Sequence, residues 1–141
     1  MKKIVAIIVA VGTILTSRSI AHASDGYLDT TWGGDGVVVS THSDSSAAYA
    51  VANYPDNRVL VVGKLDGIYP ETRMLIKRFL SNGTLDPSCN NSGEFIDTAN
   101  DAVASDLVVL SDGSFIVAGT MQINYKGTLF LAKFTSSCNI D

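Results

Sequence analysis

The sequence contains few residues of the types that build metal centres and nucleic-acid interfaces. Its 141 residues include two cysteines, two histidines, and ten lysines and arginines, against fourteen aspartates and glutamates. A structural zinc site normally takes four cysteine, histidine or carboxylate ligands, so we expect no metal site. Phosphate recognition depends on basic side chains, so nucleic acid is not an expected partner. The chain also lacks a glycine-rich phosphate loop followed by a helix, and we expect no cofactor.

Long apolar runs are also scarce, and the longest lies at the N-terminus. Lys2 and Lys3 precede an apolar stretch over residues 4–16, and the stretch Ala21-His22-Ala23 offers a small-x-small cleavage site. This pattern is typical of a secretory signal peptide and is shorter than the roughly 20 apolar residues of a membrane span. We predict a signal peptide over residues 1–23 and export to the periplasm or beyond, without stable membrane insertion after cleavage.

The two cysteines, Cys89 and Cys138, both lie in the remaining 118 residues. Disulfides persist in the compartments that exported proteins reach, so a bridge within one chain is the simplest interpretation. A bridge between two chains and two free thiols are the alternatives. The same 118 residues carry seven basic and fourteen acidic side chains, for a net charge of −7. That charge argues against binding to anionic membranes.

The chain contains the same unit twice. Three segments return in the same order, at spacings of 57, 56 and 55 residues: GYLD as GTLD, RVLVVG as SFIVAG, and LIKRF as FLAKF. Short β-rich runs repeat with them, over 36–40, 48–53, 58–63 and 74–79, and over 93–97, 102–109, 114–119 and 128–134. Turn-forming triplets such as Pro55-Asp56-Asn57 and Ser111-Asp112-Gly113 separate neighbouring runs closely enough for tight hairpins. Four short strands per unit at this period predict all-β repeats of the propeller-blade type.

The motifs of the first copy, from Gly26 to Phe79, carry a family resemblance. G-x-L-D before an aromatic residue and glycines, then P-D-N-x-V-L-V-V-G, then K-R-F before S-N-G-x-L-D, resembles the delta-60 repeat family. The resemblance implies tandem repeats similar to β-propeller blades, in exported bacterial proteins, and no defined catalytic activity. It extends over residues 26–141, but the second copy departs from it, with Cys89 at the position of Trp32 and Asn90-Asn91 at that of the glycines.

We predict repeat 1 over residues 24–82 and repeat 2 over 83–141. Residues 136–141 repeat the pattern of 81–86 and are expected to be the start of a third unit. Propellers typically have four to eight blades, so two blades cannot close a ring. We therefore expect a homo-oligomer that completes the ring head to tail, three chains being the favoured count and four the next. A monomeric two-sheet sandwich and a remnant of a longer propeller are the alternatives.

Five residues are candidate ligand-binding positions: Trp32, Tyr69, Tyr125, Asp29 and Asp86. The aromatic rings could stack on the apolar faces of sugars while the carboxylates hold hydroxyl groups. In the alternative interpretation, Trp32 packs between blades and the two aspartates accept backbone N–H groups in turns. No catalytic residue is predicted, because His42, the only histidine after residue 23, lies in a polar loop between expected strands.

These expectations favour an exported, non-enzymatic module that binds a carbohydrate or a protein. A hydrolase of the cell envelope is the competing class, because fourteen acidic residues leave room for a catalytic pair. A purely structural repeat protein is the third class.

Overall fold

A computed structural model describes residues 26–67 and 71–141 of the chain. The predicted signal peptide, residues 1–23, lies outside the described residues. Within the described ranges, no helix has the length and apolar character that crossing a membrane would take.

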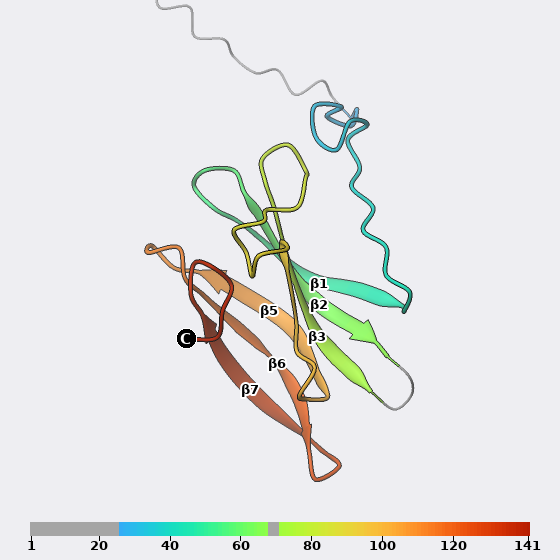
Figure 1. The fold of residues 1–141 in the computed structure, drawn as a ribbon, viewed down its shortest axis with the longest axis vertical. Helices are drawn as coiled ribbons and strands as arrows, with labels where there is room; N and C mark the ends of the chain where they lie inside the picture. The colour runs from blue at the N-terminus through green and yellow to red at the C-terminus, as the bar shows by residue number, and fades with distance from the viewer. Residues whose placement is uncertain (1–25, 68–70) are drawn as a thin grey trace, which may run out of the picture.

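Over the described residues the fold is all-β, with two antiparallel sheets (Figure 1). The first sheet has the strand order β1-β2-β3-β4 and the second has the order β5-β6-β7. The strands of the first sheet are β1 (Ser46–Asn53), β2 (Val59–Asp66), β3 (Thr72–Phe79) and β4 (Glu94–Ile96). Those of the second are β5 (Ala102–Val109), β6 (Phe115–Ile123) and β7 (Lys126–Phe134).

The turns between strands have the same geometry in both copies. Asn57, with a φ of 66°, donates its N–H to the Tyr54 carbonyl at 3.0 Å, and Gly113, with a φ of 82°, does the same to Leu110. Asparagine and glycine tolerate this left-handed conformation better than other residues. The predicted PDN and SDG triplets therefore form equivalent links in the hairpins β1–β2 and β5–β6.

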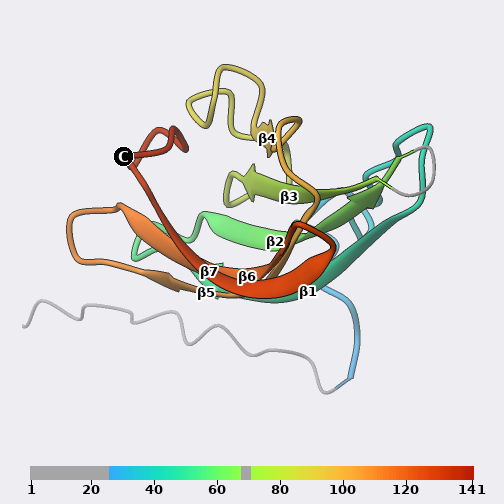
Figure 2. The ribbon, with the colours of Figure 1, turned by 90° about the horizontal axis from the view of Figure 1, so that it is seen from below.

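The boundary between the two sheets lies one strand later in the chain than the boundary between the two sequence copies. β4 lies in the second sequence copy, yet it pairs with β3 of the first sheet (Figure 2). The corresponding run of the first copy, residues 36–40, was expected to be a strand, but it pairs with no strand among the described residues. The second sheet therefore has three strands rather than the expected four. The difference arises because an extended run becomes a strand only where a sheet edge is available to pair with it, and local sequence patterns do not specify that partner.

The core lies between the two sheets, where β1, β2 and β3 contact β5. Its fully buried aromatic residues Phe115 and Phe134 stack with ring centroids 5.0 Å apart. Alternate residues of each strand point into this layer, as the period of two along a β-strand requires. The first sheet contributes Leu60, Val62, Met74 and Ile76 to this core, and the second sheet also contributes Val117.

Candidate functional site

A groove runs along the end of the second sheet next to Tyr125. Its volume is about 920 Å³, within the range of small-molecule sites. The lining combines apolar, hydroxyl, amide and carboxylate side chains: Thr72, Asp101, Val103, Thr120, Met121, Gln122, Asn124 and Tyr125. This mixture of an aromatic ring with hydrogen-bonding groups suits a polar ligand that has apolar faces.

Asp101 holds the two sheets together at this groove. Its Oδ1 accepts the N–H of Thr72, the first residue of β3, at 3.1 Å. Its backbone carbonyl accepts the N–H of Gln122 on β6 at 2.8 Å. One lining residue of the groove is therefore bonded to both sheets.

Tyr125 lies at the tip of the β6–β7 hairpin, and its side chain is fully exposed. Asn124 and Tyr125 have φ angles of 51° and 62°, and both left-handed positions match a two-residue type I′ hairpin turn. Asparagine is a favoured residue there, but a bulky residue at positive φ is uncommon and costs energy. The protein thus presents an aromatic ring to solvent at a position where glycine would be the less strained choice.

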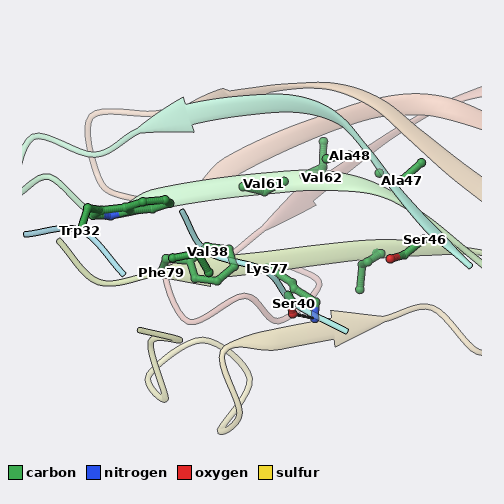
Figure 3. A pocket seen from close by; sticks show the side chains of 12 residues that line it. Trp32, Val38, Ser40, Ser46, Ala47, Ala48, Val61, Val62, Lys77 and Phe79 are labelled. Carbon is green, nitrogen blue, oxygen red and sulfur yellow. Dashed lines mark hydrogen bonds between the residues drawn. The ribbon is translucent and has the colours of Figure 1, made fainter. Parts of the chain in front are cut away.

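A second concavity lies on the face of the first sheet that points away from the core. It encloses about 290 Å³ and is lined mainly by apolar groups, including Val61, Leu75 and Phe79. Figure 3 shows Trp32 at one end and Val38 beside Phe79. The rings of Trp32 and Phe79 meet edge to face with centroids 6.5 Å apart. Residues 32–40 therefore lie along this face, although they belong to neither sheet. We call this concavity the sheet 1 hollow.

Charged groups line the edge of the sheet 1 hollow. The Lys77 ammonium lies 2.7 Å from the Glu94 carboxylate and donates to the Ser40 hydroxyl at 2.5 Å. His42 Nε2 lies 3.0 Å from the same carboxylate. Lys77 on β3 and Glu94 on β4 are register partners, so this ion pair is part of the β3–β4 ladder.

Asp86 lies in a buried ion cluster. Its Oδ2 accepts hydrogen bonds from Arg78 Nε at 2.8 Å and from Arg58 at 3.2 Å, and its Oδ1 accepts both the N–H and the hydroxyl of Ser88. Both guanidinium groups also lie over the Tyr54 ring. Burial alone would raise the pKa of Asp86. The hydrogen bonds from Ser88 and Arg58 and the charge of Arg78 outweigh this effect and lower that pKa to about 2.

The loop that contains Trp32 has a copy around Cys89. The Trp32 N–H donates to the Asp29 carbonyl at 3.0 Å, and the Cys89 N–H donates to the Asp86 carbonyl at the same distance. Asp29 also accepts the N–H and the hydroxyl of Thr31, which lowers the pKa of its carboxyl group. Equivalent turns therefore form at both positions, with tryptophan in one and cysteine in the other.

Each of these loops is anchored to the turn that follows the third strand of a repeat, β3 in the first and β7 in the second. The first donates from the Gly33 N–H to the Asn82 carbonyl at 3.0 Å. The second donates from the Asn90 N–H to the Ser137 carbonyl at 2.8 Å, and it also carries the disulfide between Cys89 and Cys138. The structure thus contains the intramolecular bridge that the sequence suggested.

The structure does not gather the five candidate ligand-binding residues into one site. Tyr125 borders the groove, Trp32 lines the sheet 1 hollow, and Tyr69 lies outside the described residues. Asp29 and Asp86 make the turn bonds of the alternative interpretation, and Asp86 is also buried by two arginines. Sequence reasoning missed Asp101, which follows no motif and gains its position only when both sheets form.

Comparison with known families matches residues 55–88 to a domain of unknown function (DUF5122) beta-propeller. The matched segment holds β2, β3 and the turn that ends at Asp86. Comparisons with curated proteins and with solved structures gave no match. The match and the two-sheet fold together support a repeat of the propeller type.

Proposed function

We propose that the protein is an exported propeller-type module, of the delta-60 kind, that binds a carbohydrate in the groove beside Tyr125. The observation that carries the proposal is the fully exposed Tyr125 ring at positive φ, next to a groove with amide and carboxylate groups. Sugars stack their C–H faces on such rings and exchange hydrogen bonds with such polar groups. The disulfide is compatible with an exported protein.

Binding accounts for the groove better than catalysis does. Asp101 is the only carboxylate among the described residues that line it. Glycoside hydrolysis normally uses a pair of carboxyl groups across the scissile bond. The backbone and one oxygen of Asp101 already hold the two sheets. We therefore assign this residue to shaping the groove.

A glycan array followed by calorimetry on the bound oligosaccharide tests the proposal. We expect the Tyr125→Ala variant to bind at least about tenfold more weakly, which corresponds to about 1.4 kcal/mol. The Tyr49→Ala variant is the matched control, because Tyr49 is an exposed tyrosine on β1 that does not line the groove. Absence of any bound glycan, or equal losses in both variants, would contradict the proposal. Release of a shortened sugar would favour the hydrolase class instead.

A further inference from the structure

The exposed apolar side chains of the described residues include those on two surfaces outside the groove. One is the outer face of the second sheet, where Leu129 and Leu131 on the edge strand β7 are 76% and 69% exposed. The other is the sheet 1 hollow with the adjacent segment 36–40, in which Val39 is 78% exposed. Among the described residues, β6 is the only strand that pairs with β7. The other backbone contacts of β7 are an isolated bridge between Phe134 and Ile140 and a bond from the Asp141 N–H to the Lys133 carbonyl at 3.0 Å.

The contact between the two sheets of one chain shows how such surfaces can fit. The second sheet turns Phe115, Val117 and Phe134 toward the first sheet. The same positions of the repeat in the first sheet are Val59, Val61 and Phe79. Val61 and Phe79 line the sheet 1 hollow, on the face that points away from the core. The two sheets therefore meet through faces that are not equivalent in the repeat. The sheet 1 hollow, which is the equivalent of the core face of the second sheet, is not covered by a sheet of the described residues, and neither is the outer face of the second sheet.

The outer face of the second sheet is the repeat equivalent of the face with which the first sheet packs in the core. The first sheet packs on the second with Leu60, Val62, Met74 and Ile76. The equivalent positions of the second sheet lie on its outer face: Ile116, Ala118, Leu129 and Leu131. The face that would continue the stack thus lies on the second sheet, and the face that would receive it is the sheet 1 hollow.

The segment 36–40 already lies where a strand of an incoming sheet would run. In the chain, β4 completes the first sheet while its Phe95 ring packs 5.2 Å from Phe134 of the second sheet. The repeat equivalents of these two residues are Val38 and Phe79, and both line the sheet 1 hollow. Val38 therefore packs on the sheet 1 hollow as Phe95 packs on the second sheet. The sheet that residues 36–40 would complete, as β4 completes the first sheet, is not present beside them in the described part of the chain.

The side chains that would meet in the added ladder are also complementary. The pair Lys77 and Glu94, which joins β3 to β4 through an ion pair, corresponds to Ala132 on β7 and to Val37. Both charged partners are replaced by apolar ones together. Pairing Ala132 with a glutamate would bury an unpaired charge, which is costly, and pairing it with valine does not.

We propose that the partner on these surfaces is a second copy of this chain, which donates residues 37–39 as a fourth strand to β7. The donating copy receives the outer face of the second sheet in its sheet 1 hollow. The contact is head to tail, so it closes into a ring when the rotation per copy allows. Three copies would give six sheets, within the size range of propellers.

The register of the added strand follows from the one that exists. In the β3–β4 ladder, the Arg78 N–H donates to the Gly93 carbonyl at 2.9 Å and the Asp97 N–H donates to the Met74 carbonyl at 3.0 Å. The corresponding bonds between copies run from the Lys133 N–H to the Gly36 carbonyl and from the Ser40 N–H to the Leu129 carbonyl. Val37 then lies opposite Ala132.

The first test is the solution mass of the protein, purified after expression of the full sequence, by light scattering and sedimentation. We expect an assembly of at least two copies and a Leu131→Glu variant that dissociates into single copies. Leu131 is exposed in one chain, so this variant should keep its fold, which circular dichroism checks. The control is Ile123→Glu, an equal change at an exposed residue near the hairpin tip, which should stay assembled.

The second test does not depend on how the charge variant folds. A double variant, Val37→Cys with Ala132→Cys, places thiols at directly opposed positions of an antiparallel ladder, where Cα atoms lie within disulfide range. Oxidation should link copies into covalent multimers on non-reducing gels. The combination Val37→Cys with Ile123→Cys should not, because those positions lie far apart in the expected register.

Three results would overturn the proposal. A wild-type protein that remains a single copy up to about 0.1 mM lacks the association that good complementary interfaces provide. Equal dissociation by Leu131→Glu and Ile123→Glu would show a nonspecific charge effect. Failure of the Val37–Ala132 cysteine pair to link copies of an assembled protein would show that another surface holds them.

Discussion

Reduction of the Cys89–Cys138 disulfide should remove much of the stability of this small protein. The bridge joins residues 49 positions apart in the sequence. Loop-closure entropy for a loop of this length is about 14 cal/mol/K, which is about 4 kcal/mol at 25 °C. Typical domains have only about 5–15 kcal/mol of unfolding free energy, so the loss should be large.

Urea unfolding with and without a phosphine reductant measures this loss. Reduction leaves both thiols in place, so little packing around the two fully buried cysteines is lost, and the comparison reports mainly on the cross-link. We expect a lower midpoint and a larger denaturant slope, because the reduced unfolded chain exposes more surface. Measurement at two protein concentrations separates the contribution of association.

The control is a Cys89→Ala/Cys138→Ala variant, on which the reductant should have no effect. A loss below about 1 kcal/mol on reduction of the wild type would refute the reasoning, because it would mean that the unfolded chain gains little freedom when the bridge opens.

Four further outcomes are expected. The pKa of Asp86 is lowered to about 2, so its contribution to stability is present above about pH 4 and is lost as the pH falls toward 2. This change amounts to up to about 2 kcal/mol. The unfolding free energy of an Asp86→Asn variant should therefore fall less steeply with decreasing pH than that of the wild type. A Gly63→Ala variant should lose several kcal/mol in thermal unfolding, because its Cβ would collide with the backbone carbonyl of Ala47 at the β1–β2 bulge. A Tyr125→Gly variant should gain up to about 1 kcal/mol in the same assay, since it relieves positive φ in a non-glycine residue, while it loses glycan binding. Mass spectrometry of the exported protein should find Ser24 as its first residue, and an intact residue 1 would contradict the predicted signal peptide.

The strands and turns could be predicted from the sequence because their signals are local. Alternation of apolar and polar residues and the two turn triplets mark the hairpins that become β1–β2 and β5–β6. The disulfide could also be predicted, since a bridge within one chain is the simplest pairing of two cysteines in a chain that is expected to be exported. The strands and turns depend on residue types that are close together in the chain, and two cysteines allow only one pairing within a chain.

The partners of β4 and Asp86 could not be predicted in this way. The run that becomes β4 has the same pattern as residues 36–40, and nothing in that pattern says that it joins the preceding sheet. Arg58, which directly precedes β2, and Arg78 on β3 reach Asp86 from 28 and 8 residues away. Their convergence follows from the pairing of Leu60 with Arg78 in the β2–β3 register, which exists only after folding.

The positive φ of Tyr125 was hidden for another reason. Hairpin links normally place glycine or asparagine at such positions, and a tyrosine there argues against that conformation on propensity alone. The strain becomes visible only when the flanking strands fix the length of the link at two residues. The sequence therefore predicted Tyr125 as a candidate ligand-binding aromatic residue, but it did not predict its positive φ.

The one-strand offset between sequence copy and sheet has a consequence for how genes of this kind can grow. Any segment made of whole copies yields a product with an unfilled sheet edge at one end and a spare strand at the other, as β7 and residues 37–39 show. After duplication or deletion of a copy, the product still has an unfilled sheet edge at one end and a spare strand at the other. Unequal recombination between copies would thus alter the number of sheets without requiring a new type of contact, so the length of the coding sequence can vary while the rule for joining sheets stays the same.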